Sequence, residues 1–439
     1  MLVSFAATNC RSIRQRVELS LVAESRPVTT DRARLLVPGF GLELVPALAI
    51  VGANGAGKSN VLRAIEYVTS AVLSSQRSWP ADGGPPRSPF EGVDGPMLEP
   101  SVFEVVFTAG DEVYEYEFHV GAEAIEYERL AVAANGPRSW TRLFERSTSP
   151  SGAVAVRAGR RLRGARSAAV DATRANSLFL SSAAQNNHRQ LQLPWRALVE
   201  SIRSASGANF SERRHRSVYT ADALLTADDA FRERLRQFIA SADLGIDDVI
   251  VREHEVDSEE TKALFAAIAT IDPSFRPPSD GNLILSQTTF AHRGDVGALE
   301  LEQESSGTLA WYEWAAPVLE TIDRGIVLGA DEIDAHLNSH LVAQIVRLFQ
   351  QPTTNRRGAQ LVFSVQDPAV LSLAGLARDQ VWVVEKQADG GTALSPVTDY
   401  SPRRDWDIGQ AYRHGRFGGL PVVDEDALAG AVIAFSDDA

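Results

Sequence analysis

The most informative part of the chain reads Gly52-Ala53-Asn54-Gly55-Ala56-Gly57-Lys58-Ser59, a glycine-rich turn that ends in a lysine and a hydroxyl residue. The apolar run 47–51 precedes it, and a helical pattern begins at Lys58. This is the strand, loop and helix of a P-loop, in which backbone N–H groups surround phosphate oxygens at a helix N-terminus. We expect Lys58 to neutralise the β- and γ-phosphates of a nucleotide and Ser59 to bind Mg²⁺. Asn60, the next residue, is assigned to the same nucleotide site.

Two adjacent carboxylates, Asp331 and Glu332, follow a second apolar run at 326–330. We predict that Asp331 holds Mg²⁺, directly or through water, and that the catalytic residue Glu332 polarises the attacking water. Such a pair is common by itself and is often an exposed strand end. Its place after the P-loop and before another helical pattern favours the catalytic interpretation.

A turn with two hydroxyl groups lies between these motifs, in Glu304-Ser305-Ser306-Gly307-Thr308, and a helical pattern follows it. Such a turn offers hydroxyls, free N–H groups and the positive end of a helix dipole to an anion. An ordinary helix cap is the alternative. The position between the two nucleotide motifs favours a nucleotide-binding role for Ser305, Ser306 and Gly307.

The remaining patterns predict an α/β fold with a P-loop core, an antiparallel β-lobe and a helical insertion. Strong alternation in 101–146 indicates antiparallel strands with one wet face. After Gly307, helices and strands alternate, which is typical of a largely parallel sheet. Further strands are expected at 2–8, 17–23, 283–290 and 297–303. The expected division is an N-terminal ATPase lobe at 1–190, the helical insertion at 191–275 and a C-terminal ATPase lobe at 276–439.

Composition narrows the possible functions. The net charge of −14 argues against a protein that coats nucleic acid with its whole surface. The single cysteine, Cys10, excludes an internal disulfide and a zinc site built from several cysteines. No apolar run approaches the ~20 residues that span a bilayer, so no membrane contact is expected. The N-terminus lacks a signal-peptide pattern, and we predict a cytoplasmic location.

Two arginine-rich segments stand out against this acidic background. They are Arg157, Arg160, Arg161, Arg163 and Arg166 in one, and Arg213, Arg214 and Arg216 in the other. Such segments are usually solvated loops. A surface for nucleic acid or for an acidic partner is the alternative that the sequence leaves open.

Taken together, the motifs resemble ATPases of the ATP-binding cassette (ABC) type, within the RecF/SMC/OLD group. The nearest branch is a family often labelled AAA ATP/GTP phosphatase, which includes phage-defence ATPases such as that of the Septu system. The turn at 9–13 is similar to its N-F-R-S-F turn, 304–308 to its signature E-S-S-G-T, and 331–334 to its D-E-I-D. The segment 412–421 is similar to its closing Y-x-x-G-R-F-G-A-I-P.

The resemblance implies a site shared between two copies of the chain. ATP would join two heads face to face, and Ser305, Ser306 and Gly307 would contact the γ-phosphate held by the partner's P-loop. A homodimer or higher homo-oligomer, ATP with Mg²⁺, and an operon-encoded effector protein are therefore expected. Gln185 lies roughly where a Mg²⁺-sensing glutamine is placed in this class, and a polar helix face is the alternative.

One departure bears on turnover. The family pattern F-T-T-H-D reads here Phe363-Ser364-Val365-Gln366-Asp367. As a catalytic residue, Gln366 can donate a hydrogen bond to a γ-phosphate, but it cannot carry the charge of a protonated imidazole. Two functions follow: an ATPase that couples hydrolysis to head association, or a slow nucleotide-gated scaffold that restrains an effector nuclease or toxin. ATP is preferred over GTP because Thr261-Lys262-Ala263-Leu264 lacks the aspartate of a guanine-reading motif.

Overall fold

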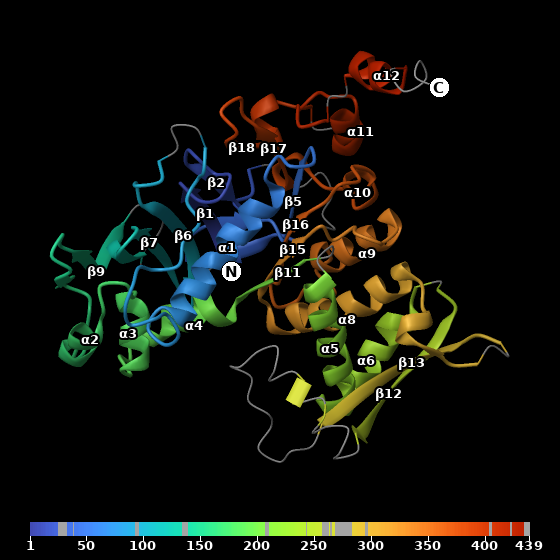
Figure 1. Ribbon diagram of the computed structural model, residues 1–439, viewed down its shortest axis with the longest axis horizontal. Coiled ribbons are helices and arrows are strands. Elements are labelled where there is room, and N and C mark those ends of the chain that lie inside the picture. The colour runs from blue at the N-terminus through green and yellow to red at the C-terminus, as the bar shows by residue number, and fades with distance from the viewer. Residues whose placement is uncertain are drawn as a thin grey trace. The chain divides into compact units, whose positions relative to one another are not determined.

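The computed structural model describes the 439-residue chain apart from 25–32, 38, 93–95, 134–138, 207–209, 243, 257–262, 264–265, 268–282, 295–296, 404–405, 422–423 and 434–439. The chain forms two compact units (Figure 1). The first contains Met1–Ser206, Thr321–Asp334 and Val342–Ala439; the second contains Gly207–Glu320 and Ala335–Leu341.

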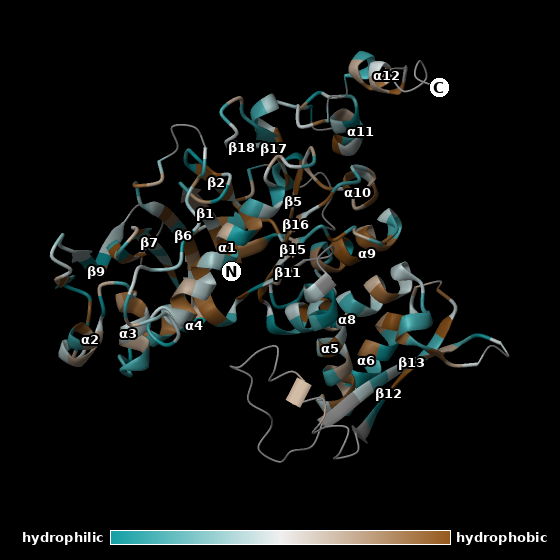
Figure 2. Ribbon diagram, viewed as in Figure 1, coloured by the Kyte–Doolittle hydropathy of each residue, from teal (hydrophilic) through white to brown (hydrophobic). Residues whose placement is uncertain are grey.

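A mainly parallel sheet forms the centre of the first unit, and its described strands follow the order β11-β15-β16-β5-β17-β18. They are β11 (Ile202–Ser206), β15 (Val327–Asp331), β16 (Gln360–Ser364), β5 (Ala47–Gly52), β17 (Val381–Lys386) and β18 (Thr392–Pro396). Only β18 among these runs antiparallel to its neighbour. Figure 2 colours β5, β15 and β16 mainly as hydrophobic, as expected for strands buried on both faces.

Helix α1 (Lys58–Ser74) begins directly after the P-loop and packs across β11, β15, β16 and β5. The predicted alternation after Gly307 is confirmed: α8 (Ser306–Arg324), β15, α9 (Ser339–Gln350), β16, α10 (Ala369–Leu373) and β17 follow one another. Helices α11 (Ile408–Arg413) and α12 (Glu425–Ile433) complete the C-terminal part. Within the described ranges, every helix is too short or too polar to cross a bilayer.

The predicted antiparallel lobe is confirmed as a sheet in the order β10-β9-β8-β7-β6-β1-β2. Its strands are β1 (Leu2–Thr8), β2 (Val17–Ser20), β6 (Ser101–Ala109), β7 (Glu112–Val120), β8 (Ile125–Ala133), β9 (Trp140–Thr148) and β10 (Val154–Ala158). Buried positions alternate with more exposed ones along β6, as the sequence pattern indicated. A separate pair consists of β3 (Leu35–Val37) and β4 (Leu42–Leu44).

Short helices attach this lobe to α1. They are α2 (Ser167–Ala172), α3 (Phe179–Gln185) and α4 (Gln192–Glu200). The fully buried carboxylate of Glu128 accepts hydrogen bonds from the backbone N–H groups of Phe179 and Leu180 at the start of α3. These bonds satisfy donors that a helix start leaves free, so α3 is anchored to the sheet.

The second unit combines α5 (Phe210–Thr226) and α6 (Asp229–Ala240) with β12 (Ile246–Val256), β13 (Leu283–His292), β14 (Leu299–Glu300) and most of α8. The prediction of a mainly helical insertion at 191–275 does not hold at two places, at β11, which joins the parallel sheet, and at β12. The β-branched residues Val249, Ile250 and Val251 favour the strand, which pairs antiparallel with β13. The strand expected at 297–303 shortens to β14 because a 3₁₀ turn occupies Leu301–Gln303.

Candidate nucleotide site

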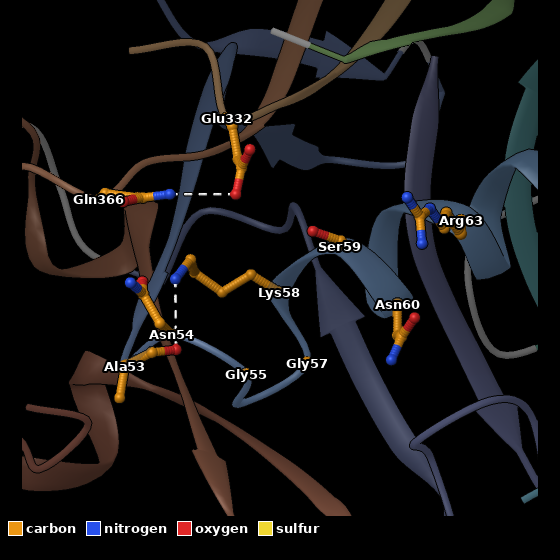
Figure 3. Close-up of a pocket in the computed structure, with 10 residues that line it drawn as sticks. All are labelled: Ala53, Asn54, Gly55, Gly57, Lys58, Ser59, Asn60, Arg63, Glu332 and Gln366. Carbon is orange, nitrogen blue, oxygen red and sulfur yellow. Dashed lines mark hydrogen bonds between the residues drawn. The ribbon is translucent and has the colours of Figure 1, made fainter. Parts of the chain in front are cut away.

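A pocket of about 460 Å³ opens in the first unit, over the P-loop that follows β5. It is lined by Ala53, Asn54, Gly55, Gly57, Lys58, Ser59, Asn60, Arg63, Glu332 and Gln366 (Figure 3). Residues predicted from two distant motifs therefore meet in one place. Gly52 and Ala56 belong to the loop without lining the pocket. Arg63, one turn further along α1, was not predicted.

Lys58 lies almost buried inside the loop, with 6% of its surface exposed. Its Nζ donates to the carbonyl oxygens of Gly52 at 2.8 Å and Ala53 at 3.3 Å. Burial lowers the pKa of Lys58, and the nearby carboxylates of Glu332, Asp334 and Asp331 act in the opposite direction. The ammonium group is therefore held by neutral carbonyls at the position where phosphate oxygens are expected.

Asp331 ends β15 with its side chain 8% exposed and directed at the P-loop helix. Its Oδ1 accepts from the hydroxyl of Ser59 at 3.0 Å and from that of Ser364 at 2.6 Å. Two predicted metal-binding residues are thus in direct contact. Their hydroxyl and carboxylate oxygens fit Mg²⁺, which takes few protein ligands and shares its remaining positions with phosphate and water.

Glu332 has a left-handed backbone, with φ of 49°. Its N–H donates to the hydroxyl of Ser364 at 2.7 Å, while Oε1 accepts from Nε2 of Gln366 at 3.0 Å. Figure 3 shows the side chains of Glu332 and Gln366 pointing toward one another above the P-loop. Ser364 was not predicted, although it lies two residues before Gln366 in the quoted motif.

Asp334 fixes the turn that carries Gln366. Its Oδ2 accepts from the backbone N–H groups of Gln366 at 2.9 Å and Asp367 at 2.8 Å. Burial raises the pKa of Asp334, and these N–H groups counteract that rise. The position of Gln366 over Glu332 is therefore determined by backbone contacts as well as by its own amide.

The outer side of the P-loop is held by two hydroxyl residues from other strands and turns. Thr392 donates to the carbonyl oxygen of Ala56 at 2.9 Å and lies 2.7 Å from the hydroxyl of Ser12. Asn60 donates to the same Ser12 hydroxyl at 2.7 Å. Gly57 leaves room for this network, because a Cβ there would lie 2.2 Å from Oγ1 of Thr392.

The closing segment 412–421 lies against the first glycine of the loop. The N–H of Gly419 donates to Glu385 at 3.1 Å, and its carbonyl oxygen accepts from Tyr412 at 2.9 Å. A Cβ on Gly419 would lie 2.6 Å from Val383 and 3.5 Å from the Cα of Gly52. Gly419 also has a φ of 69°, so both space and backbone conformation require glycine there.

The turn before α8 belongs to the second unit. Ser305 caps this helix, since its Oγ accepts from the N–H of Thr308 at 3.1 Å. Ser306 is exposed, and a Cβ on Gly307 would lie 3.3 Å from the carbonyl oxygen of His336. The cap that was the alternative interpretation is present at Ser305, whereas Ser306 remains available at the helix start.

Gln185 is not brought to the pocket, which corrects its assignment as a Mg²⁺ ligand. It is exposed at the end of α3, and this helix is attached to α1 through Ser181, whose Oγ donates to the carbonyl of Val72 at 2.7 Å. Val72 lies about 21 Å from Lys58 along α1, at about 1.5 Å per residue. Its position in the sequence was compatible with binding Mg²⁺, but the fold places α3 against the C-terminal part of α1, far from the P-loop.

The structure also corrects the interpretation of the second arginine-rich segment as a solvated loop or a partner surface. Arg213 donates to both carboxylate oxygens of Glu313, at 2.9 and 3.2 Å, and Arg216 donates to the same group at 3.2 Å. Arg216 is buried over the ring of Trp314. Only Arg214 of the three is exposed, so this segment serves packing between α5 and α8.

The parallel sheet, the P-loop and the paired carboxylates define a P-loop nucleotide-binding protein. The family described as "AAA domain, putative AbiEii toxin, Type IV TA system" matches residues 48–372, and the chain belongs to it. The predicted resemblance to ABC-type AAA ATPases of the RecF/SMC/OLD group is confirmed by this match and by the α/β fold. A comparison with curated proteins gives no match.

Solved structures similar to the chain include SMC head domains. The SMC head domain from Thermotoga maritima matches with 14% identity and a TM-score of 0.40, covering 90% of this chain and 98% of that one. An Smc head bound to the C-terminal winged-helix domain of ScpA matches with 14% identity and a TM-score of 0.42, covering 90% and 96%. An Smc head with an extended coiled coil, bound to the C-terminal domain of ScpA derived from Pyrococcus furiosus, matches with 14% identity and a TM-score of 0.39, covering 94% and 99%.

Proposed function

We propose that this protein is a Mg²⁺-dependent ATPase whose ATP-driven association controls a partner protein. The observation that carries the proposal is the meeting of Lys58, the Ser59–Asp331 pair and Glu332 around one pocket. Lys58 supplies the cation for the β- and γ-phosphates, and Ser59 and Asp331 supply oxygen ligands for Mg²⁺, which offsets phosphate charge when bound. Glu332 lies on the opposite wall, where it can accept a proton from a water that attacks the γ-phosphorus.

Association follows from the signature turn. Ser306 and the free N–H groups at the start of α8 form an exposed anion-binding end on the second unit. We propose that this end meets the γ-phosphate of a second copy, in a two-fold homodimer or a higher homo-oligomer with shared sites. An operon-encoded effector protein would bind the associated state and be controlled by it. The family description, which names a putative toxin of a type IV toxin–antitoxin system, supports action together with a partner protein, and we propose that this action serves phage defence or DNA transactions.

Phosphate release by the purified full chain tests the enzyme. Turnover should depend on Mg²⁺ and rise with protein concentration, because complete sites form only in the associated state. Light scattering with a non-hydrolysable ATP analogue tests association, and co-purification from the native operon identifies the effector. A chain that binds ATP but stays monomeric with the analogue contradicts the shared site. The cytoplasmic location stays a prediction.

A slow nucleotide-gated scaffold that restrains a nuclease or toxin is the second candidate, and the contact between Gln366 and Glu332 favours it. The amide occupies one oxygen of the catalytic carboxylate and adds no positive charge at the γ-phosphate. Gln366→His should then raise turnover by about tenfold or more, since imidazole can bear a proton. If Gln366→His leaves an already rapid turnover unchanged, the scaffold interpretation is excluded.

A further inference from the structure

Four arginines with exposed side chains lie on two loops at the edge of the first unit. They are Arg160, Arg163 and Arg166 on the loop before α2, and Arg189 on the loop after α3. None of the four forms an ion pair with any residue that the structure describes. We call these four residues the arginine surface.

Gln190 joins the two loops into one surface. Its Oε1 accepts from the backbone N–H of Arg163 at 2.7 Å, and its Nε2 donates to the carbonyl oxygen of Arg161 at 3.2 Å. This double contact fixes the loop before α2 against the residue next to Arg189. The arginine backbones are therefore held together before any ligand binds, which reduces the entropy cost of binding.

The buried side chain of His188 packs under the loop that carries Arg163 and Arg166. Its ring is 4% exposed, and a Cβ on Gly164 would lie 3.6 Å from its Nε2. Burial lowers the pKa of His188, and the positive charge of Arg166 lowers it further, so the guanidinium of Arg166 is near the ring. The cationic loop therefore rests on a neutral, buried side chain.

The base of the surface is fixed to the C-terminal end of α1. Arg174 donates to the carbonyl oxygen of Ser75 at 2.8 Å, and Gln76 donates to that of Ala172 at 3.0 Å. Figure 1 shows α2 and α3 at this end of the unit, beside the antiparallel lobe. The arginine surface is therefore separate from the nucleotide pocket at the start of α1.

Two other arginines of the segment are not part of this surface. Arg161 forms an ion pair with Glu112 at 3.2 Å, and Arg157 lies in β10 instead of on either loop. The remaining four keep their charge in a chain whose net charge is −14. The net negative charge of the molecule repels phosphate groups, so a cluster of cationic side chains is needed to attract them.

The surface chemistry indicates the class of partner. Within 157–190, where every residue is described, no large hydrophobic side chain is exposed. Protein–protein interfaces centre on aromatic and apolar residues, to which arginine is added, whereas nucleic-acid interfaces are strongly positive as a whole. The absence of exposed aromatic rings in this range also disfavours stacking on single-stranded bases.

We propose that the arginine surface binds the phosphodiester backbone of a nucleic-acid duplex, without reading its sequence. Four phosphate contacts predict a slope of about −3.6 for the logarithm of the association constant against the logarithm of salt concentration. Between 50 and 200 mM salt, affinity should fall about 150-fold.

Fluorescence anisotropy of labelled duplexes, measured on the full chain without nucleotide, tests the proposal. The variant with Arg160→Gln, Arg163→Gln, Arg166→Gln and Arg189→Gln should lose most of this affinity and most of the salt slope. A control with Arg16→Gln, Arg347→Gln, Arg356→Gln and Arg413→Gln removes the same charge elsewhere and should bind as wild type. DNA duplexes and RNA duplexes of unrelated sequence are measured separately, and their affinities show which of the two nucleic acids the surface binds.

Three outcomes overturn the proposal. They are wild-type binding by the four-site variant, an equal loss in the control, or no duplex binding by the wild type at low salt. Binding to vesicles containing phosphatidylserine, but not to duplexes, would assign the surface to a membrane and overturn it as well. Because no nucleotide is present, failure of the ATPase proposal leaves the result interpretable.

Discussion

The side-chain hydroxyls of Ser12 and Thr392 lie 2.7 Å apart, although 380 positions separate them in the chain. Through Thr392 the pair holds the backbone of the P-loop at Ala56, and through Ser12 it holds Asn60 on α1. The loop therefore takes its conformation from both ends of the sequence as well as from its own glycines.

Thr392→Val should weaken ATP binding roughly fivefold, because it removes a hydrogen bond worth about 1 kcal/mol and leaves the Ala56 carbonyl without this donor. Thr392→Ser keeps the hydroxyl and should bind ATP nearly as wild type. Isothermal titration with an ATP analogue measures both. Equal affinities in all three proteins would show that the hydroxyl does not support the loop.

Lys58→Ala should weaken ATP binding by about a hundredfold, because the phosphates lose a charge-assisted partner worth about 3 kcal/mol. Arginine does not replace it, since a planar guanidinium does not fit inside the loop. Lys386→Ala removes an exposed lysine at the end of β17 and serves as the control. Tight binding of a labelled analogue by Lys58→Ala would show that the P-loop assignment is wrong.

Glu332→Gln should reduce turnover by at least ~10² while ATP stays bound, the usual scale for losing a positioned base. The substituted amide can still accept from Gln366 through its oxygen, so the pocket geometry is retained. Trapped ATP should also increase the associated fraction in light scattering. Undiminished phosphate release would remove Glu332 from the catalytic role.

Ser364→Ala should lower turnover by about tenfold with little change in ATP affinity. The hydroxyl donates to Asp331 and accepts from the N–H of Glu332, so its loss disturbs both carboxylates and leaves the P-loop intact. Single-turnover kinetics and analogue binding separate the two effects. A variant that loses affinity but keeps its rate would contradict this assignment.

Ser306→Arg tests the shared site, because a bulky side chain blocks the start of α8. Nucleotide binding to the isolated chain should stay near normal, whereas turnover and ATP-dependent association should fall by at least ~10². Ala230→Arg places the same side chain in the first turn of α6 and should change neither. Full activity and association in Ser306→Arg would reduce the turn to a helix cap.

Mixing Ser306→Arg with Lys58→Ala adds a complementation test. In a two-fold dimer each site takes its P-loop from one chain and its signature turn from the other. A mixed dimer therefore has one site with both defects and one with neither. Activity that returns on mixing supports contribution from the partner chain, provided that the subunits exchange.

Local patterns predicted the parts of the fold and site that depend on short sequence ranges. The P-loop and the Asp331–Glu332 pair each consist of consecutive residues after an apolar strand, so their roles follow from chain order. The predicted Mg²⁺-binding role of Gln185 was wrong because its place depends on how α3 packs on the C-terminal part of α1. The burial of Arg213 and Arg216 could not be predicted because their neutralising partner, Glu313, lies about a hundred positions away in the chain.

Ser364 and Thr392 could not be found for a related reason. A serine or threonine at a strand end has no pattern that distinguishes it from a solvated hydroxyl, and its role appears only when the neighbouring strand is known. The strand β12 was missed because a charged alternating segment next to two helices was interpreted as their continuation.

The contact between Gly419 and Gly52 has a consequence for the order of events during synthesis. Ribosomes deliver the P-loop early and the segment 412–421 late, yet the first glycine of the loop packs against that late segment. The strand carrying Thr392 also emerges more than 300 residues after the P-loop. The P-loop of the nascent chain therefore lacks these two supports until residues 392–421 have also left the ribosome, so the loop reaches its final conformation long after its own residues have been made.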